Sequence, residues 1–564
     1  MFRLTFVIPL VVTILMGVNL TISQWSNDPA INNAVATATG LQLWAQLVSD
    51  GAGGAVIAWT DYRTGVPTIY AQRFDWFGYA QWSFNGIAVC PQSNVSPYLR
   101  MTSDGNHGAI VTWSDSRTVD PGTYVQRIDS SGIVRWPTGG VFLSPAGGFP
   151  RICSDGTGGA IITYFGYHGD SLAIFAQRVD ASGTTLWTPG GRVVAIGYGD
   201  RPTIAADGVG GAIITWPDFR SGVHWDVYAQ RINQQGTALW TFGGVLISSN
   251  VADTNHATLQ PTIISDGNRG AIIAWHDYRS GSNYDARIQR VDSSGVVRWL
   301  PNGIPLTSGL GDQIFPVVAP DGSGGAFVSW DDYRSGSADV YAQRVSASGT
   351  VLWSANGVGV SVAANHQLSG RIISDARGGA IIVWSDSRNG TSNSDIYAQR
   401  LNPQGLSLWS INGVPISTAP NSQTEPAITS DGTGGAIMCW RDYRNGINNG
   451  DIYAQQVNRN GQLGVVLEVA FGEDPVSPSF VLRQNYPNPF NPITTIEFAL
   501  PKSARATLKV FDLLGREVAT LVGENLPVGA HKAEWNAGGI SSGVYLYRLV
   551  AGNFIQTKKL VLLR

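Results

Sequence analysis

A tryptophan, an aspartate and an arginine recur at alternate positions along this chain, in the pattern Trp-x-Asp-x-Arg. Seven copies are present: Trp59/Asp61/Arg63, Trp113/Asp115/Arg117, Trp216/Asp218/Arg220, Trp275/Asp277/Arg279, Trp330/Asp332/Arg334, Trp384/Asp386/Arg388 and Trp440/Asp442/Arg444. A carboxylate beside a guanidinium could act as a general acid or base next to an anion-binding group. An active site needs one such constellation, however, and not seven. We therefore interpret the motif as a structural network on one face of a strand, with Asp and Arg pairing toward the next repeat.

Other chemistry has weak support in the sequence. A Ser-Asp-Gly-x-Gly-Gly turn could offer calcium an oxygen ligand, but each copy supplies one carboxylate where a site needs several oxygens. The seven histidines show no metal-ligand spacing, and neither a phosphate-binding loop nor a nucleophile elbow is present. The three cysteines (Cys90, Cys153, Cys439) do not form a disulfide framework. We predict no metal and no cofactor.

The elements that must position these residues are themselves repeated. An Asp-Gly-like turn recurs about every 54 residues, with its aspartate at Asp50, Asp104, Asp155, Asp207, Asp266, Asp321, Asp375 and Asp431. Short apolar runs separated by Gly, Asn, Asp and Ser divide each copy into four strands. Four antiparallel strands repeated eight times are typical of a β-propeller, whereas a linear solenoid would need atypical capping repeats.

The ends of the repeat region predict a closed ring. The eighth copy stops near Gly464 without the tryptophan that begins the fourth strand of the other copies, and the segment from Trp25 to Val35 supplies it. Seven tryptophans are expected on second strands, in the motif above. Seven more are expected on fourth strands, with Trp25 as the eighth member: Trp82, Trp136, Trp187, Trp240, Trp299, Trp353 and Trp409.

Composition limits the function. The chain has 564 residues, a net charge of −3 and 10% aromatic residues, which excludes a disordered chain and gives no reason to expect nucleic-acid binding. Residues 1–23 resemble a secretory signal peptide, with an uncleaved membrane anchor as the alternative. We expect an exported protein.

Binding is expected where the repeat is broken. Connections between second and third strands, and between one copy and the next, vary in length and share one face of the ring. Candidate ligand-binding residues on this face are Tyr62, His168, His224, Trp225, Tyr278, Tyr284, Tyr333 and Tyr443. The alternative is that these aromatic residues only cover neighbouring loops.

The last 85 residues carry a recognisable pattern. The residues Tyr486, Pro487, Asn488, Pro489 and Phe490 open it, and Gly543 and Tyr545 lie near its end. This order resembles the C-terminal sorting domains of type IX secretion cargo, which are similar to the immunoglobulin-like domain of flagellar hook-capping proteins. The resemblance implies contact with the outer-membrane secretion machinery and a secreted or surface location in a Gram-negative-type bacterium.

The sequence therefore predicts an all-β chain: an eight-bladed β-propeller of four-stranded repeats, closed by an N-terminal strand and followed by a C-terminal immunoglobulin-like β-sandwich. The expected divisions are a signal peptide at 1–23, the propeller at 24–468, a linker at 469–479 and the sorting domain at 480–564. Two function classes stay open. One is a non-catalytic propeller that binds glycan or protein; the other is a hydrolase or lyase acting on extracellular polysaccharide. An enzyme should show a unique carboxylate constellation, and Glu425 is the only glutamate before residue 468.

Overall fold

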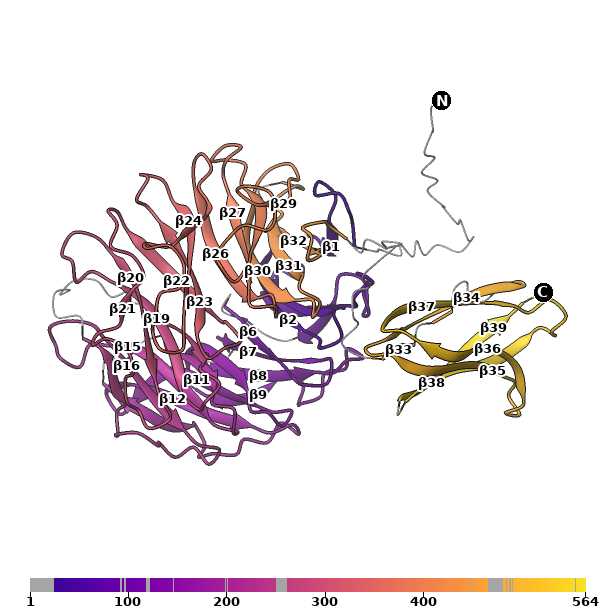
Figure 1. Cartoon of the computed structure of the whole chain (residues 1–564). Coiled ribbons are helices and arrows are strands. Elements are labelled where there is room, and N and C mark those ends of the chain that lie inside the picture. The colour runs from indigo at the N-terminus through magenta and orange to yellow at the C-terminus, as the bar shows by residue number, and fades with distance from the viewer. Residues whose placement is uncertain are drawn as a thin grey trace, which may run out of the picture.

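The computed structural model describes residues 25–464 and 480–563, apart from residues 92–93, 96–97, 118–121, 146, 198, 200, 250–260, 447, 483, 486–487, 489 and 553. The expected signal peptide and linker lie outside the described residues. Every regular element of the described chain is a β-strand (Figure 1). None of the described segments forms a helix of the length and apolarity needed to span a membrane.

Blades 1 to 4 are antiparallel four-stranded sheets whose strands are adjacent in chain order. Their strands are β2 (Gln42–Ser49), β3 (Ala55–Asp61), β4 (Thr68–Phe74) and β5 (Ile87–Cys90); β6 (Arg100–Ser103), β7 (Ala109–Asp115), β8 (Gly122–Ile128) and β9 (Val141–Ser144); β10 (Gly148–Ser154), β11 (Ala160–His168), β12 (Ser171–Val179) and β13 (Arg192–Ile196); and β14 (Thr203–Ala206), β15 (Ala212–Asp218), β16 (Asp226–Ile232) and β17 (Val245–Ser248).

Blades 5 to 7 repeat this order, and blade 8 takes its fourth strand from the N-terminus. Their strands are β18 (Thr262–Ser265), β19 (Ala271–Asp277), β20 (Asp285–Val291) and β21 (Ile304–Pro305); β22 (Gln313–Pro320), β23 (Ala326–Asp332), β24 (Asp339–Val345) and β25 (Val358–Ser361); β26 (Gln367–Ser374), β27 (Ala380–Asp386), β28 (Asp395–Leu401) and β29 (Val414–Ser417); and β30 (Gln423–Ser430), β31 (Ala436–Asp442), β32 (Asp451–Val457) and β1 (Asn33–Ala36).

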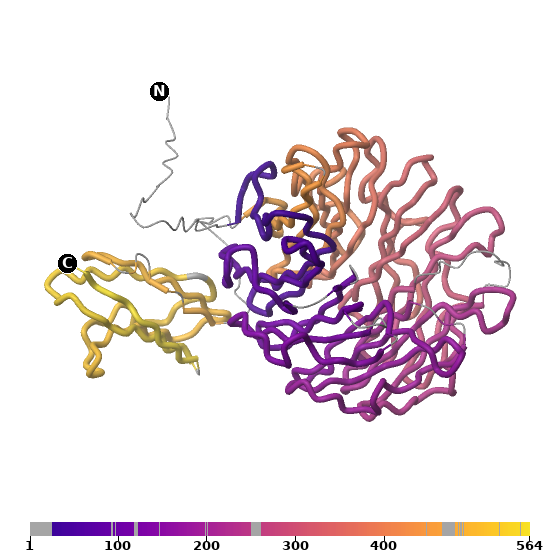
Figure 2. Tube along the Cα trace, turned by 180° about the vertical axis from the view of Figure 1, so that it is seen from behind, coloured from indigo at the N-terminus to yellow at the C-terminus, as the bar shows by residue number. Residues whose placement is uncertain are grey.

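The eight sheets form a closed ring, as predicted. The first strand of each blade contacts the first strand of the next, and β2 contacts β30 to complete the circle. β1 pairs antiparallel with β32, so the N-terminal segment lies against the last blade (Figure 2). This arrangement is an eight-bladed β-propeller whose channel is lined by the first strands.

Tryptophan and glycine together define the contact between blades. The indole N–H of Trp136 donates to the carbonyl of Ala181 in the next blade at 3.1 Å, and Trp25 makes the equivalent bond to Trp76 at 2.9 Å. A Cβ on Gly183 or Gly78 would lie 2.7 Å or less from the same indoles. The next blade can approach this closely because glycine carries no side chain.

The predicted location of these tryptophans was wrong in one respect. Trp136 precedes the fourth strand, β9, and lies in the connection from β8. There the side chain of Gln126 replaces a strand partner: its Oε1 accepts from the Trp136 N–H at 3.0 Å and its Nε2 donates to the Pro137 carbonyl at 2.9 Å. The same two bonds occur in blades 3 to 7. The recurring glutamine therefore holds the tryptophan without a ladder of backbone hydrogen bonds.

The Trp-x-Asp-x-Arg motif is part of the frame. In blade 4, Asp218 Oδ2 accepts from the Trp216 indole at 2.7 Å, and both carboxylate oxygens accept from the Arg220 guanidinium at 2.9 and 2.6 Å. The pairing predicted with the next repeat is thus made within the motif. The arginine also stacks on the tyrosine of its own third strand; Arg220 lies 3.8 Å from the Tyr228 ring centroid.

Both carboxylate oxygens of the Asp-Gly turn also accept hydrogen bonds. Asp155 Oδ1 accepts from the N–H groups of Thr157 and Gly159, and its Oδ2 accepts from the Arg178 guanidinium at 2.8 Å. Equivalent aspartate–arginine pairs occur in blades 1 to 7. The turn therefore ties the first two strands to the third. The three cysteines are buried, and none of them forms a disulfide with another described residue.

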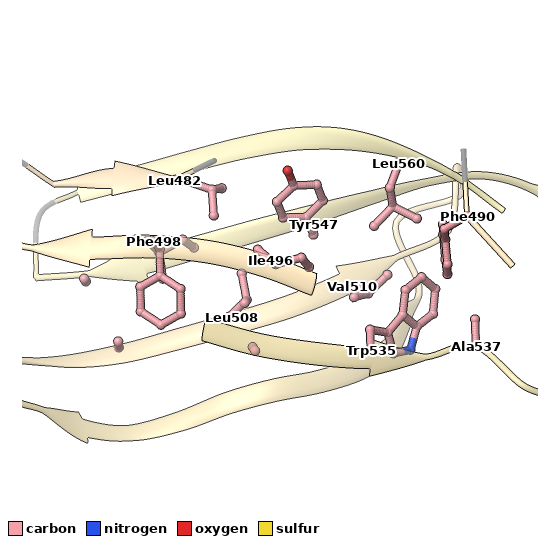
Figure 3. Packing of buried hydrophobic residues seen from close by; sticks show 14 of the residues in the cluster. Leu482, Phe490, Ile496, Phe498, Leu508, Val510, Trp535, Ala537, Tyr547 and Leu560 are labelled. Atoms are coloured by element: carbon pink, nitrogen blue, oxygen red, sulfur yellow. The ribbon is translucent and has the colours of Figure 1, made fainter. Parts of the chain in front are cut away.

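The C-terminal segment forms two sheets that share one core (Figure 3). One sheet contains β33 (Val481–Leu482), β34 (Ile493–Leu500) and β37 (Gly529–Asn536); the other contains β35 (Ala504–Phe511), β36 (Glu517–Leu526), β38 (Gly543–Ala551) and β39 (Phe554–Leu562). Phe490 is buried with Trp535 between the sheets, and Tyr545 packs edge-on against Trp535 at 5.9 Å. Asn488 accepts from the Val561 N–H at 2.8 Å, whereas Tyr486, Pro487 and Pro489 lie outside the described residues.

Candidate functional site

A β-bulge interrupts the first strand at the same repeat position in blades 1, 3, 6, 7 and 8. The bulge lies at the channel end that also carries the connections between second and third strands, because it faces the end of each second strand. The variable loops therefore surround a channel mouth whose rim is made of bulged residues. Bulges of this kind redirect a side chain next to binding sites.

The residue at this repeat position adopts a left-handed backbone conformation in most blades although it is not glycine. This holds for six blades: Trp44, Phe149, Arg201, Phe315, Ser369 and Glu425, with φ between 40° and 62°. Such a conformation costs about 1–3 kcal/mol for a residue with a Cβ and is concentrated at functional sites. Tyr98 occupies the same position in blade 2. The side chain at this position differs from blade to blade, while the surrounding frame repeats.

The residues at this repeat position in four neighbouring blades form a continuous arc. The rings of Trp44 and Tyr98 lie 5.5 Å apart, and those of Tyr98 and Phe149 lie 5.9 Å apart. The Arg201 guanidinium lies 5.2 Å from the Phe149 ring centroid and extends the arc into blade 4. Tyr98 is 41% exposed and Trp44 and Phe149 are half-buried. We call Trp44, Tyr98, Phe149 and Arg201 the aromatic arc.

A second aromatic group lies at blades 5 and 6. His276 contacts the Phe315 ring at 5.5 Å and the Tyr284 ring at 5.2 Å, and Tyr284 packs against Tyr278 at 5.1 Å. The His276 Nδ1 also accepts from the Phe315 N–H at 3.3 Å. Two of the predicted residues, Tyr278 and Tyr284, are thus connected to the rim through His276.

Glu425 opens the bulge of blade 8 and defines an acidic corner of the mouth. Its Oε1 lies 3.7 Å from the Arg441 guanidinium, which lies 4.6 Å from the Tyr443 ring centroid. Burial raises the pKa of the Glu425 carboxyl, opposed by Arg441, a hydrogen bond from the Trp44 backbone and Arg371. Among the described residues, neither Oε2 of Glu425 nor Nε of Arg441 has a hydrogen-bond partner.

Asp331 is a second carboxylate near the rim, and it is 4% exposed. It follows the Trp330 of blade 6 and accepts from the Ser369 N–H of blade 7 at 3.3 Å. Burial raises its pKa to about 6, against the attraction of Arg371 and two backbone hydrogen bonds. Its role is to hold the blade 7 bulge in place.

This pKa predicts a pH dependence of stability. A carboxyl whose pKa is raised on folding stabilises the protein while protonated, and that contribution is lost as the pH rises from about 4 through 6. We expect Asp331→Asn to gain stability relative to the wild type between pH 4 and pH 7.5, by about 2–3 kcal/mol at about 1.4 kcal/mol per pKa unit. Guanidinium unfolding of both proteins at pH 4 and pH 7.5 measures this difference in stability. An equal stability difference between the two proteins at both pH values would contradict this explanation.

The remaining predicted ligand residues lie on the variable-loop face but not all in one place. Trp225 packs against Phe219 at 5.2 Å in the blade 4 loop, where His224 Nδ1 lies 2.9 Å from Asp226. Tyr333 lies 6.5 Å from the His366 ring. His168 is exposed at the tip of the β11–β12 hairpin, and Tyr62 is half-buried in the blade 1 loop. They remain predicted binding residues.

The aromatic arc was not predicted from the sequence, although a signal was present. Each bulged residue lies six positions before the aspartate of the Asp-Gly turn, and a proline follows it in Pro150, Pro202, Pro261, Pro316 and Pro426. Proline within a strand is tolerated at bulges because it lacks an N–H. Aligning the eight copies on the Asp-Gly turn and on this recurring proline identifies the position that forms the arc. Across the described residues, His, Cys, Asp and Glu do not gather into a group that could hold a metal ion.

Comparison with known proteins identifies the C-terminal segment. Residues 484–563 match the family model of the secretion system C-terminal sorting domain. This segment is therefore a sorting domain of type IX secretion cargo, and the protein interacts with that machinery. It is secreted or held at the cell surface of a Gram-negative bacterium of the Bacteroidetes type.

The chain as a whole has distant likenesses among solved structures. A polysaccharide lyase of family PL25, an ulvan lyase, is 9% identical, with 79% of this chain and 98% of that chain covered and a TM-score of 0.40. An α-L-arabinanase of Penicillium chrysogenum is 13% identical, with coverages of 57% and 95% and a TM-score of 0.32. PorZ of Porphyromonas gingivalis is 12% identical, with coverages of 91% and 74% and a TM-score of 0.25. No curated protein matches the sequence.

Proposed function

We propose that this exported propeller binds an extracellular polysaccharide at its channel mouth without cleaving it. The observation that carries the proposal is the aromatic arc, in which Trp44, Tyr98 and Phe149 form adjoining rings on three neighbouring blades. Exposed aromatic faces in a row suit a chain of sugar rings, because each pyranose presents an apolar face of C–H groups. A rigid ring that carries variable residues at one rim is typical of a binding scaffold.

The backbone supports a binding role for the arc. Left-handed residues fixed by the frame hold their side chains in place before a ligand arrives, which reduces the ordering cost of binding. The frame that fixes them is buried: the Trp59 ring behind the first bulge is fully enclosed, and Gly86 allows its tip to approach. The arc is thus a preorganised surface on a rigid support.

Removal of the tryptophan ring at one end of the arc tests the proposal. We expect Trp44→Ala to weaken binding of a soluble polysaccharide at least tenfold in calorimetric titration of the full chain. The matched control is Phe242→Ala, which removes an exposed aromatic residue (69% exposed) in the connection before the outermost strand of blade 4, and it should change affinity less than twofold. If the folded wild-type protein binds no member of a broad glycan panel, the proposal is refuted. Equal losses of affinity in Trp44→Ala and Phe242→Ala would also refute it.

A second candidate function is cleavage of the bound polysaccharide, favoured by Glu425. Its raised pKa and its position beside Arg441 at the mouth suit a general acid or base. Incubating candidate polymers with the wild type and Glu425→Gln, and measuring new reducing ends or unsaturated products, distinguishes the two. Product formation that is lost in Glu425→Gln would establish cleavage in place of simple binding.

A further inference from the structure

Three arginines occupy one repeat position inside the channel. Arg100, Arg151 and Arg371 each lie four residues before the aspartate of the Asp-Gly turn, on β6, β10 and β26. The same position in other blades holds neutral residues such as Thr203 and Val317. Each arginine comes two residues after the bulged position of its own blade, which is about 7 Å deeper along an extended strand.

These three guanidinium groups differ from the arginines of the frame because they lack an acidic partner. No carboxylate of the described residues forms an ion pair with any of the three, whereas Arg220 and its equivalents each hold an aspartate. Their hydrogen bonds go to carbonyls of their own strands: Arg100 Nη1 donates to Leu99 at 2.7 Å and Arg151 Nη1 to Pro150 at 3.2 Å. Asp331 and Glu425 act on Arg371 only at longer range.

The positive charges repel one another within the channel. Burial, followed by repulsion from Arg371, lowers the pKa of Arg100 to about 10. Burial, followed by repulsion from Arg100 and Arg201, lowers the pKa of Arg151 to about 9. Arginine otherwise remains charged far above this range. A cluster of cations that line one channel and lack an acidic partner is a site that an anion would neutralise.

A cavity lies beside two of these arginines. It has a volume of about 250 Å³ and is lined by Arg100, Arg151, Thr203 and Thr262 together with apolar residues of the first strands. Its walls come from blades 2 to 6, so it lies below the part of the rim that carries Tyr98, Phe149 and Arg201. The half-buried state of Arg100 and Arg151 shows that solvent reaches them along the channel.

We propose that the channel arginines Arg100 and Arg151, with Arg371 adding positive charge nearby, bind the carboxylate or sulfate groups of an acidic polysaccharide whose sugar rings stack on the aromatic arc. This inference rests on the proposed function. The planar guanidinium fork matches a carboxylate or a sulfate ester with two parallel hydrogen bonds. Because Arg100 and Arg151 follow Tyr98 and Phe149 by two residues, one chain can place its rings at the rim and turn an acidic substituent into the channel.

The charge distribution around the mouth predicts where the acidic groups of the ligand lie. Arg201 adds a positive charge at the rim of blade 4, on the side of Arg100 and Arg151. Glu425 lies in blade 8 near Arg441, and Asp331 lies in blade 6, where Arg371 of blade 7 attracts it. The acidic groups of the ligand are therefore expected over blades 2 to 4, and not over the acidic corner.

Calorimetric titration of the full chain with chemically matched oligosaccharides tests this inference. The probes are galacturonate oligomers, sulfated galactan oligomers, neutral galactan oligomers of the same length, and inorganic sulfate alone. We expect at least one acidic oligomer to bind tenfold or more tightly than the neutral one. Arg100→Gln/Arg151→Gln should remove that advantage and leave neutral binding within twofold. Arg298→Gln, on an exposed hairpin, should behave as the wild type.

The outcomes separate this inference from the function on which it rests. Equal binding of acidic and neutral oligomers, unchanged in the double variant, would overturn the acidic ligand and leave polysaccharide binding intact. If none of the oligomers binds, both the acidic ligand and the polysaccharide-binding function are overturned. Binding of inorganic sulfate without any oligomer would show a free-anion site and overturn the polysaccharide assignment. Circular dichroism of each variant shows that it is folded as the wild type.

Discussion

A protein that lacks residues 25–36 is expected to lose the cooperative unfolding of the propeller. These residues supply β1 and the eighth indole of the ring. They also contact blade 7, because the Asn32 side chain donates to the Ile416 carbonyl at 2.8 Å and accepts from Ser417 at 2.8 Å. Removing the segment exposes the edge of β32, and an unpaired edge promotes association with other chains.

Two point variants in this segment show the expected size of the effect on stability. Trp25 is 4% exposed and stacks on Phe74 of blade 1 at 5.5 Å, so Trp25→Ala should cost about 3–5 kcal/mol. Ile31 is 61% exposed in the same segment, and Ile31→Ala should change stability by less than about 0.5 kcal/mol. Urea unfolding followed by circular dichroism measures all three proteins. An unchanged midpoint after deletion of the segment would show that the ring does not depend on this closure.

The second large effect concerns the aspartate of the repeated motif. Asp218 is 1% exposed and accepts four hydrogen bonds, from the Trp216 indole and from the backbone and guanidinium of Arg220. Asp218→Ala leaves the Arg220 charge unpaired and the indole N–H unsatisfied, which should cost about 3–5 kcal/mol. Guanidinium unfolding measures the loss. Asp170→Ala, at the exposed tip of the blade 3 hairpin, is the matched control and should cost less than about 0.5 kcal/mol.

The same variant tests whether the motif is structural or acts on the ligand. If the motif is structural, Asp218→Ala should bind polysaccharide within twofold of the wild type at a temperature where it is folded. The equivalent substitution in another blade, Asp386→Ala, should behave alike, because the two sites have the same partners. Abolished binding in one folded variant and not in the other would show that this copy of the motif acts on the ligand.

The frame was predictable because its determinants are local and repeat. Tryptophan, glycine and the Asp-Gly turn recur at a constant period, and the ring closure follows from the one tryptophan that the eighth copy lacks. Within the repeated motif, the hydrogen-bonded partners lie nearby in the chain, as for Trp216 and Asp218. The predictions that failed concern short-range geometry. A glutamine side chain, and not a strand, holds Trp136, and Arg220 pairs within its own motif.

The candidate site was less predictable because it is built from differences between copies. The first strands are the least repetitive part of each blade, and a bulge within them reverses the side-chain alternation that a regular strand would show. Trp44, Tyr98 and Phe149 are 54 and 51 residues apart in the chain and meet only when neighbouring blades pack against one another. Loop residues such as Tyr284 were predictable, because the variable connections are visible in the sequence.

The central claim is that the channel mouth binds polysaccharide on the aromatic arc. A crystal structure of the protein with a bound acidic oligosaccharide tests it most directly. The account predicts a sugar ring stacked on Trp44, Tyr98 or Phe149, with a carboxylate or sulfate oxygen within hydrogen-bond distance of Arg100 or Arg151. An oligosaccharide bound instead at the outer loops, for example against Trp225 and Phe219, with an empty channel mouth, would contradict it.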